Sequence, residues 1–498
     1  MSFFAHHPIM LVAVPLAFAA VCPLLGLWRR DLCYWWALLG AAATSFCAWA
    51  LVGSVRAGAA VAYDLGDWPP PWGIRLRIDR PALMVACAVT SAVLLMMVYS
   101  YRRSSCEDGA ARSPGVYSCT LMLLGTAGAL GVISSGDLFN MLLFVQVTGV
   151  AAAGFVAARG GSRAARAAFG YLVALTGSAV MFLLATGLLY SVTGALDMKK
   201  ISLQLQVLKQ GYVPVAVVSL VVSVLALAVP SALFPASWWL ADAATASEEP
   251  AGALLAGTVV SVCCFTFFRV LYSVFSPGLS KVETARSMTA NTLAWVGMAA
   301  FVFGAVTALF QDDLERIAAR CSISQAGLVV TGIAATSHRA LAGGLLAVVS
   351  GVVGISCMFL SVSALTHGCD VRGVRDLRGM GRRRPVAASA FALASLSLVG
   401  VPFTIGFTAK WELAGGLLDR GWYVPVLLLF LGSAAALLCL GRVVYLLFAE
   451  AESKCAGRPP LAMSAVSLAF GLGAVALGAL GHALTTWLLE AIRPLLTW

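Results

Sequence analysis

The sequence has little charge. Asp, Glu, Lys and Arg together make up only 11% of its 498 residues, whereas 60% of the residues are hydrophobic. A soluble globular protein has about 25% charged residues, so this composition excludes a water-soluble enzyme or binding domain. The polar segments between the apolar runs are also too short to form a soluble domain. We therefore expect an all-α polytopic membrane protein whose segments cross the bilayer.

Motifs for metals and cofactors are also missing. None of the 13 cysteines forms a Cys-x-x-Cys pair, and the chain has only five histidines. No Gly-rich loop marks a nucleotide site. Most cysteines lie inside apolar runs, where a thiol packs as a small hydrophobic group. We expect no cofactor and no metal in this chain.

The formal net charge of +11 does not indicate binding to nucleic acid. The Lys and Arg residues lie in short loops between apolar runs, where membrane orientation and lipid headgroups account for them. The largest cluster comprises the six arginines of segment 372–384, "RGVRDLRGMGRRR". We expect this cluster to fix the orientation of the chain or to contact anionic lipid. The acidic face of a partner subunit is the alternative.

Apolar runs follow one another along most of the chain. About 20 apolar residues suffice for one crossing, and the sequence predicts about fourteen helices, at 8–28, 32–56, 81–101, 116–134, 136–158, 165–192, 212–235, 251–275, 286–310, 318–336, 339–366, 386–418, 422–449 and 461–495. The runs 386–418 and 461–495 exceed the length of a straight crossing, so we expect them to be tilted, kinked or extended beyond the membrane. No Lys or Arg precedes the first run, which favours a spanning helix over a cleaved signal peptide.

Basic residues are unevenly distributed between the two sets of loops. If the N-terminus lies outside, most of them fall in inside loops, namely Arg29, Arg30, Arg102, Arg103, Arg112, Arg159, Arg163, Arg166, Arg316, Arg320, Lys454, Arg458 and the cluster at 372–384. Because cytoplasmic loops carry the excess of Lys and Arg, we expect a cytoplasmic (inner) membrane protein with both termini outside. The inside loop 241–250 has three acids and no base, but acids contribute little to orientation.

One external segment, 57–80, has an alternating pattern. Ile74, Leu76 and Ile78 alternate with Arg75, Arg77 and Asp79. Such alternation predicts a short strand or hairpin on the outer face. An ordered loop without a partner strand is the alternative.

Four segments together resemble a known family. They are "SGDLFNMLLFVQV", "PSALFPASWWLADAATASEEPAGALLAG", "DLERIAARCSISQAGLVVTGIA" and "SLVGVPFTIGFTAKW", which begin at residues 135, 230, 313 and 397. They are similar to the antiporter-like membrane subunits shared by respiratory complex I, Mrp-type cation/proton antiporters and membrane-bound energy-converting hydrogenases. The resemblance implies fourteen helices: three in 1–115, two inverted five-helix repeats at 116–275 and 286–449, and a C-terminal helix at 461–495.

The family has one interrupted helix in each repeat, and the sequence permits both. Pro230 and Pro235 lie inside one apolar run, and Gly400, Pro402 and Gly406 lie inside another. Proline removes an amide donor and breaks the helix, and paired interruptions are typical of transporter sites. Two ordinary proline kinks are the alternative.

The resemblance also implies an ion path in which this chain has lost most charges. In the family, protons are thought to pass along ionisable side chains at mid-membrane, whose charges shift one another's pKa. The resemblance places Gln146 at the position of a glutamate, Pro230 and Ser261 at or near lysines, Glu315 at a basic residue, and Gly351 and Ile355 near a histidine and a lysine. Only the ionisable residue of the second interrupted helix remains, as Lys410.

The candidate ion-path residues are Lys410, Glu412, Gln146, Asp137, Ser261 and His482. Lys410 is the principal candidate, although a lysine near a helix end could instead extend to the interface. Glu412 is expected to pair with Lys410 or to face the same surface. Asp137 is expected to cap its helix. His482 could titrate, but a lone histidine on an apolar helix is more often a hydrogen-bonded structural residue.

These residues predict an antiporter-like membrane-arm subunit of a multi-subunit redox or antiporter complex, with a degenerate proton path and a mainly structural role. Its expected partners are other membrane subunits and lipids. The alternative is active H⁺ or Na⁺ translocation through Lys410 and a water wire held by Gln146, Ser261, Ser350 and Ser356. A membrane enzyme is a remote alternative. It would need acids or histidines clustered at one membrane face, and only the segment 241–250 has clustered acids, without a histidine.

Overall fold

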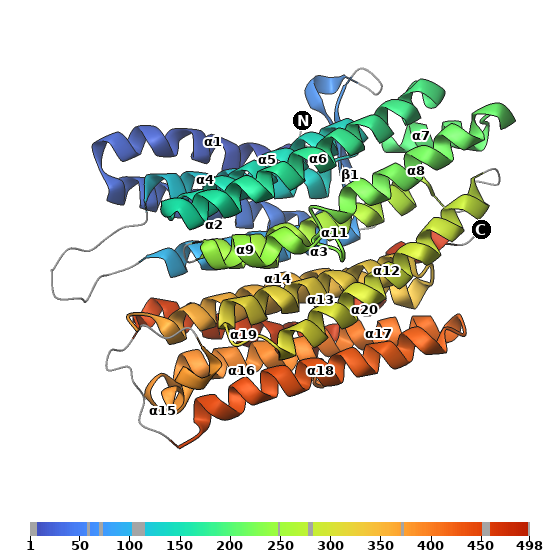
Figure 1. Ribbon diagram of the computed structural model, residues 1–498. Helices are drawn as coiled ribbons and strands as arrows, with labels where there is room; N and C mark the ends of the chain where they lie inside the picture. Colours follow the sequence, from blue (N-terminus) through green and yellow to red (C-terminus); the bar gives the residue numbers. More distant parts are fainter. Residues whose placement is uncertain are drawn as a thin grey trace.

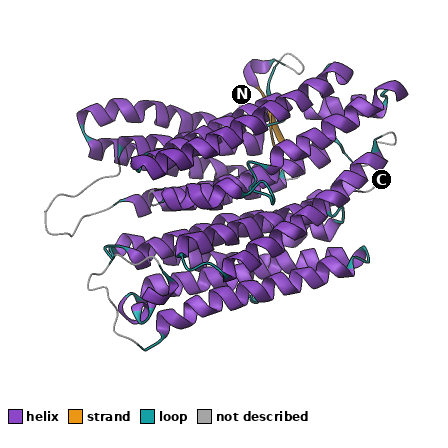
Figure 2. Ribbon diagram, viewed as in Figure 1, coloured by secondary structure: helices purple, strands orange, loops and turns teal. Residues whose placement is uncertain are grey.

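The computed structural model describes residues 7–56, 60–68, 73–101, 115–247, 250–276, 282–369, 373–450 and 459–496. Helices account for nearly all of this part of the chain, and they run side by side through one bundle (Figure 1, Figure 2). Thirteen of the described helices are long and apolar enough to cross a membrane. The chain is therefore an all-helical, multi-pass membrane protein, as its composition predicts.

The helices follow the predicted spans closely. They are α1 (His7–Trp28), α2 (Arg30–Arg56), α3 (Arg80–Ser100), α4 (Val116–Ser134), α5 (Leu138–Ala157), α6 (Gly161–Thr193), α7 (Met198–Gln206), α8 (Val213–Ala228), α9 (Trp238–Ala246), α10 (Ala251–Ala253), α11 (Val260–Phe268), α12 (Glu283–Leu309), α13 (Leu314–Ala334), α14 (His338–Thr366), α15 (Met380–Arg383), α16 (Pro385–Val399), α17 (Ile405–Asp419), α18 (Tyr423–Phe448), α19 (Leu461–Ala479) and α20 (Gly481–Leu496). The π-helical turns η4 (Leu254–Val259) and η5 (Arg269–Val274) join α10 and α11 into a single span.

Three of the expected spans are interrupted. α8 ends before Pro230, and α9 begins only after Pro235, because neither proline can donate the helical hydrogen bond. α16 ends at Gly400, whose φ of +90° is the left-handed conformation that commonly terminates helices. α19 and α20 meet at Leu480. The two runs that are too long for a straight crossing are therefore both broken. The sequence predicts the break in 386–418, whereas it predicts one C-terminal helix at 461–495, where the structure has two.

The external segment forms the predicted hairpin. Strand β1 (Val61–Asp64) pairs antiparallel with β2 (Arg75–Ile78), with Val61 opposite Ile78 and Asp64 opposite Arg75. Leu76 and Ile78 are buried, as the alternation predicts. At the end of the hairpin where the connecting loop begins, Arg75 Nε donates to Asp64 Oδ1 at 2.6 Å.

A buried ion pair fixes this hairpin to the membrane bundle. Arg269 in η5 is 1% exposed, and its Nη1 lies 2.7 Å from Asp79 Oδ2. Asp79 follows β2 directly and also caps α3 by accepting from the Ala82 amide. A second guanidinium nitrogen of Arg269 donates to the Ile133 carbonyl at 2.9 Å. One arginine therefore ties the hairpin, α3, α4 and η5 together.

Two spans form the centre of the bundle. The most apolar windows of α14 and of the span Ala251–Val274 are fully buried, whereas those of α1 and α6 are about one-third buried. Close helix contacts at glycines help to enclose the centre: α12 meets α13 where Gly297 lies against Gly327, with no space for a side chain. The central helices touch protein on all sides, so polar groups on them face other helices rather than lipid.

The two ends of the bundle differ. The hairpin lies at one end, where Arg80 of α3 pairs with Glu490 of α20 at 2.7 Å, whereas α15 lies at the other (Figure 1). The basic loops that include Arg159, Arg316 and Arg382 lie at the α15 end. The basic residues Arg102, Arg103, Arg112, Arg372, Lys454 and Arg458 fall outside the described residues. Which end faces the cytoplasm stays a prediction.

We expect Asp79→Asn to destabilise the protein by about 3–5 kcal/mol, because it leaves the buried charge of Arg269 without its partner. Asp64→Asn is the matched control, because its pair with Arg75 is more exposed and contributes about 0–1 kcal/mol. The apparent melting temperatures of the purified proteins in detergent test this. Equal melting temperatures for the two variants would contradict it.

The hairpin should also loosen in acid. The Arg75 guanidinium holds the pKa of the Asp64 carboxyl below its ordinary value. A pKa lowered by folding stabilises the folded state above the unfolded-state pKa, and this contribution is lost as the pH falls through the folded-state pKa. Hydrogen exchange of residues 61–64 should therefore accelerate in that acidic range relative to an Asp64→Asn protein at the same pH. Superimposable profiles for the two proteins would refute the role of this pair.

Candidate functional site

The second helix break holds a buried cation. Lys410, on the second turn of α17, is 8% exposed and reaches back to the end of α16. Its Nζ donates to the carbonyls of Leu398 at 2.8 Å and Val399 at 2.9 Å, and to the Ser433 hydroxyl at 3.0 Å. The Phe301 ring lies 5.4 Å from the same atom. All three donor positions of the ammonium are thus used.

Local sequence explains this arrangement. Gly400 terminates α16, and its amide donates to the carbonyls of Leu396 and Ser397, so the carbonyls of Leu398 and Val399 are left without a helical partner. Those carbonyls also form the negative end of the helix dipole, where a cation is favoured. α17 restarts after Thr404, whose side chain caps the Phe407 amide. The break therefore creates acceptors that suit an ammonium, and Lys410 supplies it.

The structure contradicts the alternative position for Lys410 and one of the two expectations for Glu412. Lys410 does not extend to the membrane interface, because its side chain is buried against the break. Glu412 does not pair with it: Glu412 Oε2 lies 3.2 Å from Arg339 Nε. Residues two apart on a helix point in different directions, so the pair could not form on α17. Among the described residues, no carboxylate forms an ion pair with Lys410.

Ser261 lies in a second group of polar side chains at the centre. A Cβ added at Gly351 of α14 would lie 2.6 Å from Ser261 Oγ and 3.3 Å from Gln325 Cγ, so the three residues are in contact. The Gln325 amide donates to the Ala347 carbonyl at 3.0 Å. A cavity of about 10 Å³ is lined by Gln325 together with Phe301, Ala305, Ala308, Cys321, Ser324, Leu398, Ala436 and Leu440. That volume holds about one water molecule.

Several buried serine and threonine hydroxyls in the described bundle have no protein hydrogen-bond partner. They are those of Ser231, Thr258, Ser350 and Ser397. Ser350 and Ser397 both lie against Gly406, next to the break that holds Lys410. Ser356, by contrast, donates to the Ala253 carbonyl at 3.4 Å. Buried hydroxyls are normally satisfied, so these four sites are suited to bind water.

The other candidates lie elsewhere. Gln146 is half-buried on the face of α5 that carries the exposed Leu143 and Val150, and its amide nitrogen has no partner among the described residues. Asp137 caps α5 by accepting from the Asn140 amide at 2.8 Å, and burial raises the pKa of its carboxyl. His482 is exposed on α20. The six candidates therefore do not form one row, and only Lys410 and Ser261 lie near the centre.

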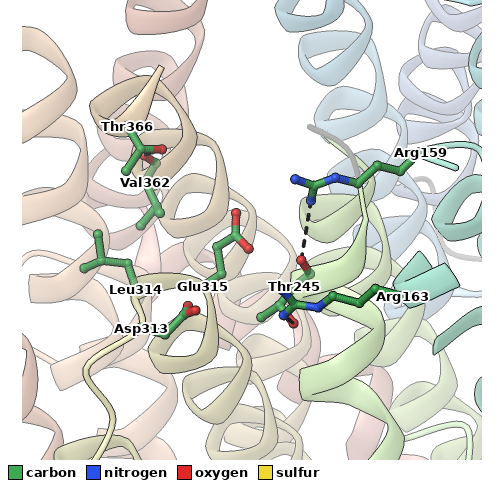
Figure 3. Close-up of a pocket in the computed structure, with 8 residues that line it drawn as sticks. All are labelled: Arg159, Arg163, Thr245, Asp313, Leu314, Glu315, Val362 and Thr366. Carbon is green, nitrogen blue, oxygen red and sulfur yellow. Dashed lines mark hydrogen bonds between the residues drawn. The ribbon is translucent and has the colours of Figure 1, made fainter. Parts of the chain in front are cut away.

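Glu315 lines a pocket of about 90 Å³ at the α15 end of the bundle (Figure 3). Arg159 and Arg163 with Thr245 form one wall, and Asp313 and Glu315 belong to the opposite one. Arg159 donates to the Ser247 carbonyl at 2.8 Å. The pocket lies at helix ends, so Glu315 is not in the middle of the bundle.

Two polar residues of the centre were not singled out from the sequence. Gln325 had a visible signal, since it is an amide inside an apolar run as Gln146 is. Ser433 had none, because a serine in an apolar helix usually bonds its own backbone. Its contact with Lys410 depends on how α18 packs against the break.

Comparisons with known proteins agree with this architecture. The family model described as "NADH:quinone oxidoreductase/Mrp antiporter, TM" matches residues 135–438. The chain is 32% identical to NADH-quinone oxidoreductase subunit N of Desulforudis audaxviator (strain MP104C), over 98% of this chain and 99% of that protein. It is 25% identical to an Na(+)/H(+) antiporter subunit of Bacillus subtilis (strain 168), over 76% of this chain and 74% of that one.

Solved structures share the fold. A chain of the membrane-bound sulfane sulfur reductase, an archaeal respiratory membrane complex, matches with a TM-score of 0.88 and 23% identity, over 98% of this chain and 97% of that one. A chain of the Mrp complex from Dietzia sp. DQ12-45-1b matches with a TM-score of 0.87 and 21% identity, over 100% and 98%. Both matched chains are subunits of multi-subunit membrane complexes.

The break should be sensitive to a single methyl group. Gly400→Ala places a side chain at φ +90°, and its Cβ would lie 2.9 Å from Lys410 Cδ. We expect a loss of about 1–3 kcal/mol of stability from this strain. Gly441→Ala in α18 is the control: an added Cβ there has no neighbour within 4 Å, and alanine favours a helix by about 0.5–1 kcal/mol. Thermal unfolding in detergent measures both, and a Gly400→Ala protein as stable as the control would contradict the strain.

Proposed function

Because the chain belongs to the NADH:quinone oxidoreductase/Mrp antiporter family of membrane subunits, we propose that its role in such a complex is mainly structural, with a degenerate proton path. The chain would serve as an antiporter-like part of the membrane arm and hold its neighbours in place. Redox chemistry, where the complex has any, would belong to other subunits. The proposal includes an inner-membrane location with both termini outside.

One observation carries the proposal: Lys410 is the only buried lysine among the described residues. The other buried cations there are Arg269, Arg286 and Arg384, and arginine keeps its proton in proteins. A proton path at mid-membrane needs titratable groups that couple to one another. Amides and hydroxyls can organise water, but they do not gain or lose a proton near neutral pH.

The surroundings of Lys410 support the same view. Its ammonium is held by two carbonyls and a hydroxyl rather than by a carboxylate. Carbonyl acceptors keep a constant charge, so they do not switch the lysine as an ionising carboxylate would. In this arrangement, the lysine stabilises the broken end of α16.

Active ion translocation is a second candidate function. The partnerless hydroxyls of Ser231, Thr258, Ser350 and Ser397 favour it, because bound water could link them toward Lys410. The cavity of about 10 Å³ beside Leu398, an acceptor of Lys410, has room for about one such water. This path would depend on Lys410 as its single proton-exchanging group.

Isolation from the native membrane tests the subunit role. The tagged chain should co-purify with other membrane subunits in a fixed ratio, and deletion of its gene should release those subunits from one another. Recovery of the chain alone under mild detergent would refute the subunit role.

Ion flux separates the two candidate functions. We expect complexes with Lys410→Met, reconstituted in vesicles, to keep H⁺ and Na⁺ flux within about twofold of wild type, because the lysine stabilises the break rather than carrying ions. Lys209→Met, in an exposed loop, is the control. A loss of about tenfold or more with subunit composition unchanged would favour translocation through Lys410 and overturn the structural role.

A further inference from the structure

Two helix breaks meet on the surface of the bundle. Gly478, at the end of α19, packs directly against the backbone of Phe403 and Thr404 in the α16–α17 break. Gly481, at the start of α20, packs against Thr408 of α17. Neither glycine has space for a side chain. The α19–α20 junction and the α16–α17 break therefore form one continuous patch, which we call the double break.

The double break lies deep in the membrane. α16 and α17 have 15 residues each, so each extends about 22 Å at 1.5 Å per residue. The hydrocarbon core of a bilayer is about 30 Å thick. A break between two such segments lies near its middle. The junction between α19 and α20 lies at the same depth, since it contacts the break.

Part of this patch is uncovered. Phe403 is 80% exposed and Leu480 is 57% exposed. Pro402 and His482 are exposed as well. Phe403 has φ +69°, and within the described part of the chain its amide makes no backbone hydrogen bond.

The exposed part of the double break is not suited to face lipid. Irregular backbone at this depth occurs only where protein covers it or where it lines a water-filled cavity. The large apolar side chains of Phe403 and Leu480 do not suit water. An ionisable side chain such as His482 normally faces protein and has a polar partner there. Cover by a protein helix meets all three conditions.

The first helix break shows what such cover looks like. Between α8 and α9, residues 230–233 are buried. Phe234 packs on Phe303 of α12, with ring centroids 4.4 Å apart. A spanning helix of the second half of the chain thus covers Phe234 in the first break, although Pro235 stays exposed there. The second break has no equivalent cover among the described residues, since Phe403 stays exposed.

We propose that the double break is the docking site for a spanning helix of a different membrane subunit, with a side-chain oxygen at the depth of His482. This inference rests on the proposed role as a subunit of a multi-subunit complex. Apolar and aromatic side chains of the partner helix pack on Phe403 and Leu480, as Phe303 packs on Phe234. A carboxylate or amide oxygen accepts from the His482 imidazole.

Site-specific photocrosslinking in the assembled complex tests the proposal. Benzoylphenylalanine replaces Phe403, which keeps an aromatic ring at the exposed position and leaves the bundle intact. Irradiation in native membranes, followed by purification and mass spectrometry, should identify one crosslinked peptide from a spanning helix of another subunit. Crosslinks to lipid alone, or to a second copy of this chain, would overturn the proposal.

Variants of His482 test the polar contact. His482→Ala should reduce co-purification of the crosslinked subunit about two- to tenfold, as expected for one lost hydrogen bond, and His482→Gln should restore it. Thr486→Ala, one turn along on the same exposed helix, is the matched control. Equal recovery in the His482→Ala and Thr486→Ala proteins would refute the polar contact.

These outcomes separate the docking site from the proposed function. If other membrane subunits co-purify but Phe403 crosslinks only to lipid, the docking site is wrong and the subunit role stands. If no membrane subunit co-purifies with the wild-type chain, the subunit role itself is wrong.

Discussion

Backbone N–H and C=O groups inside a bilayer must find hydrogen-bond partners within the protein, because hydrocarbon offers none. This constraint makes the chain helical almost throughout, and it gives special importance to the places where helices stop. At the end of α16, the carbonyls of Leu398 and Val399 accept from Lys410. The ammonium needs acceptors in a medium without water, and the carbonyls need donors. The broken end of α16 and the charge of Lys410 therefore stabilise each other.

The same constraint explains the different surroundings of the two breaks. In the break after α8, Phe234 packs on Phe303 of α12, whereas in the break after α16 the side chain of Phe403 stays exposed. Such asymmetry suits a subunit that continues into a neighbour on one side. It also agrees with the matched structures, which are parts of larger membrane complexes.

Most buried charged side chains among the described residues are arginines. Arg269 is tied to Asp79 at the hairpin end, and Arg384 donates to the carbonyls of Ala364 and Leu365 at the end of α14. Both arginines link helices through these contacts. Among the buried basic side chains of the described residues, Lys410 is the one that is not an arginine. The family relationship indicates a membrane subunit, and this fixed pattern of charge favours a scaffold.

Much of the fold could be predicted from the sequence by itself, because the patterns that mark spans, breaks and the hairpin are local. The lengths of the apolar runs predicted the spans, and Pro230 and Gly400 marked the breaks. The alternation of apolar and charged residues around Leu76 indicated the hairpin. Only the tertiary structure decided which polar groups meet. Glu412 pairs with Arg339 of α14, a helix that is distant in the sequence but adjacent in space. The Ser433 hydroxyl accepts from Lys410, and Gln146 lies on the same outer face of α5 as Leu143 and Val150. Hydropathy and helical period describe one segment at a time, whereas these contacts depend on how separate helices pack.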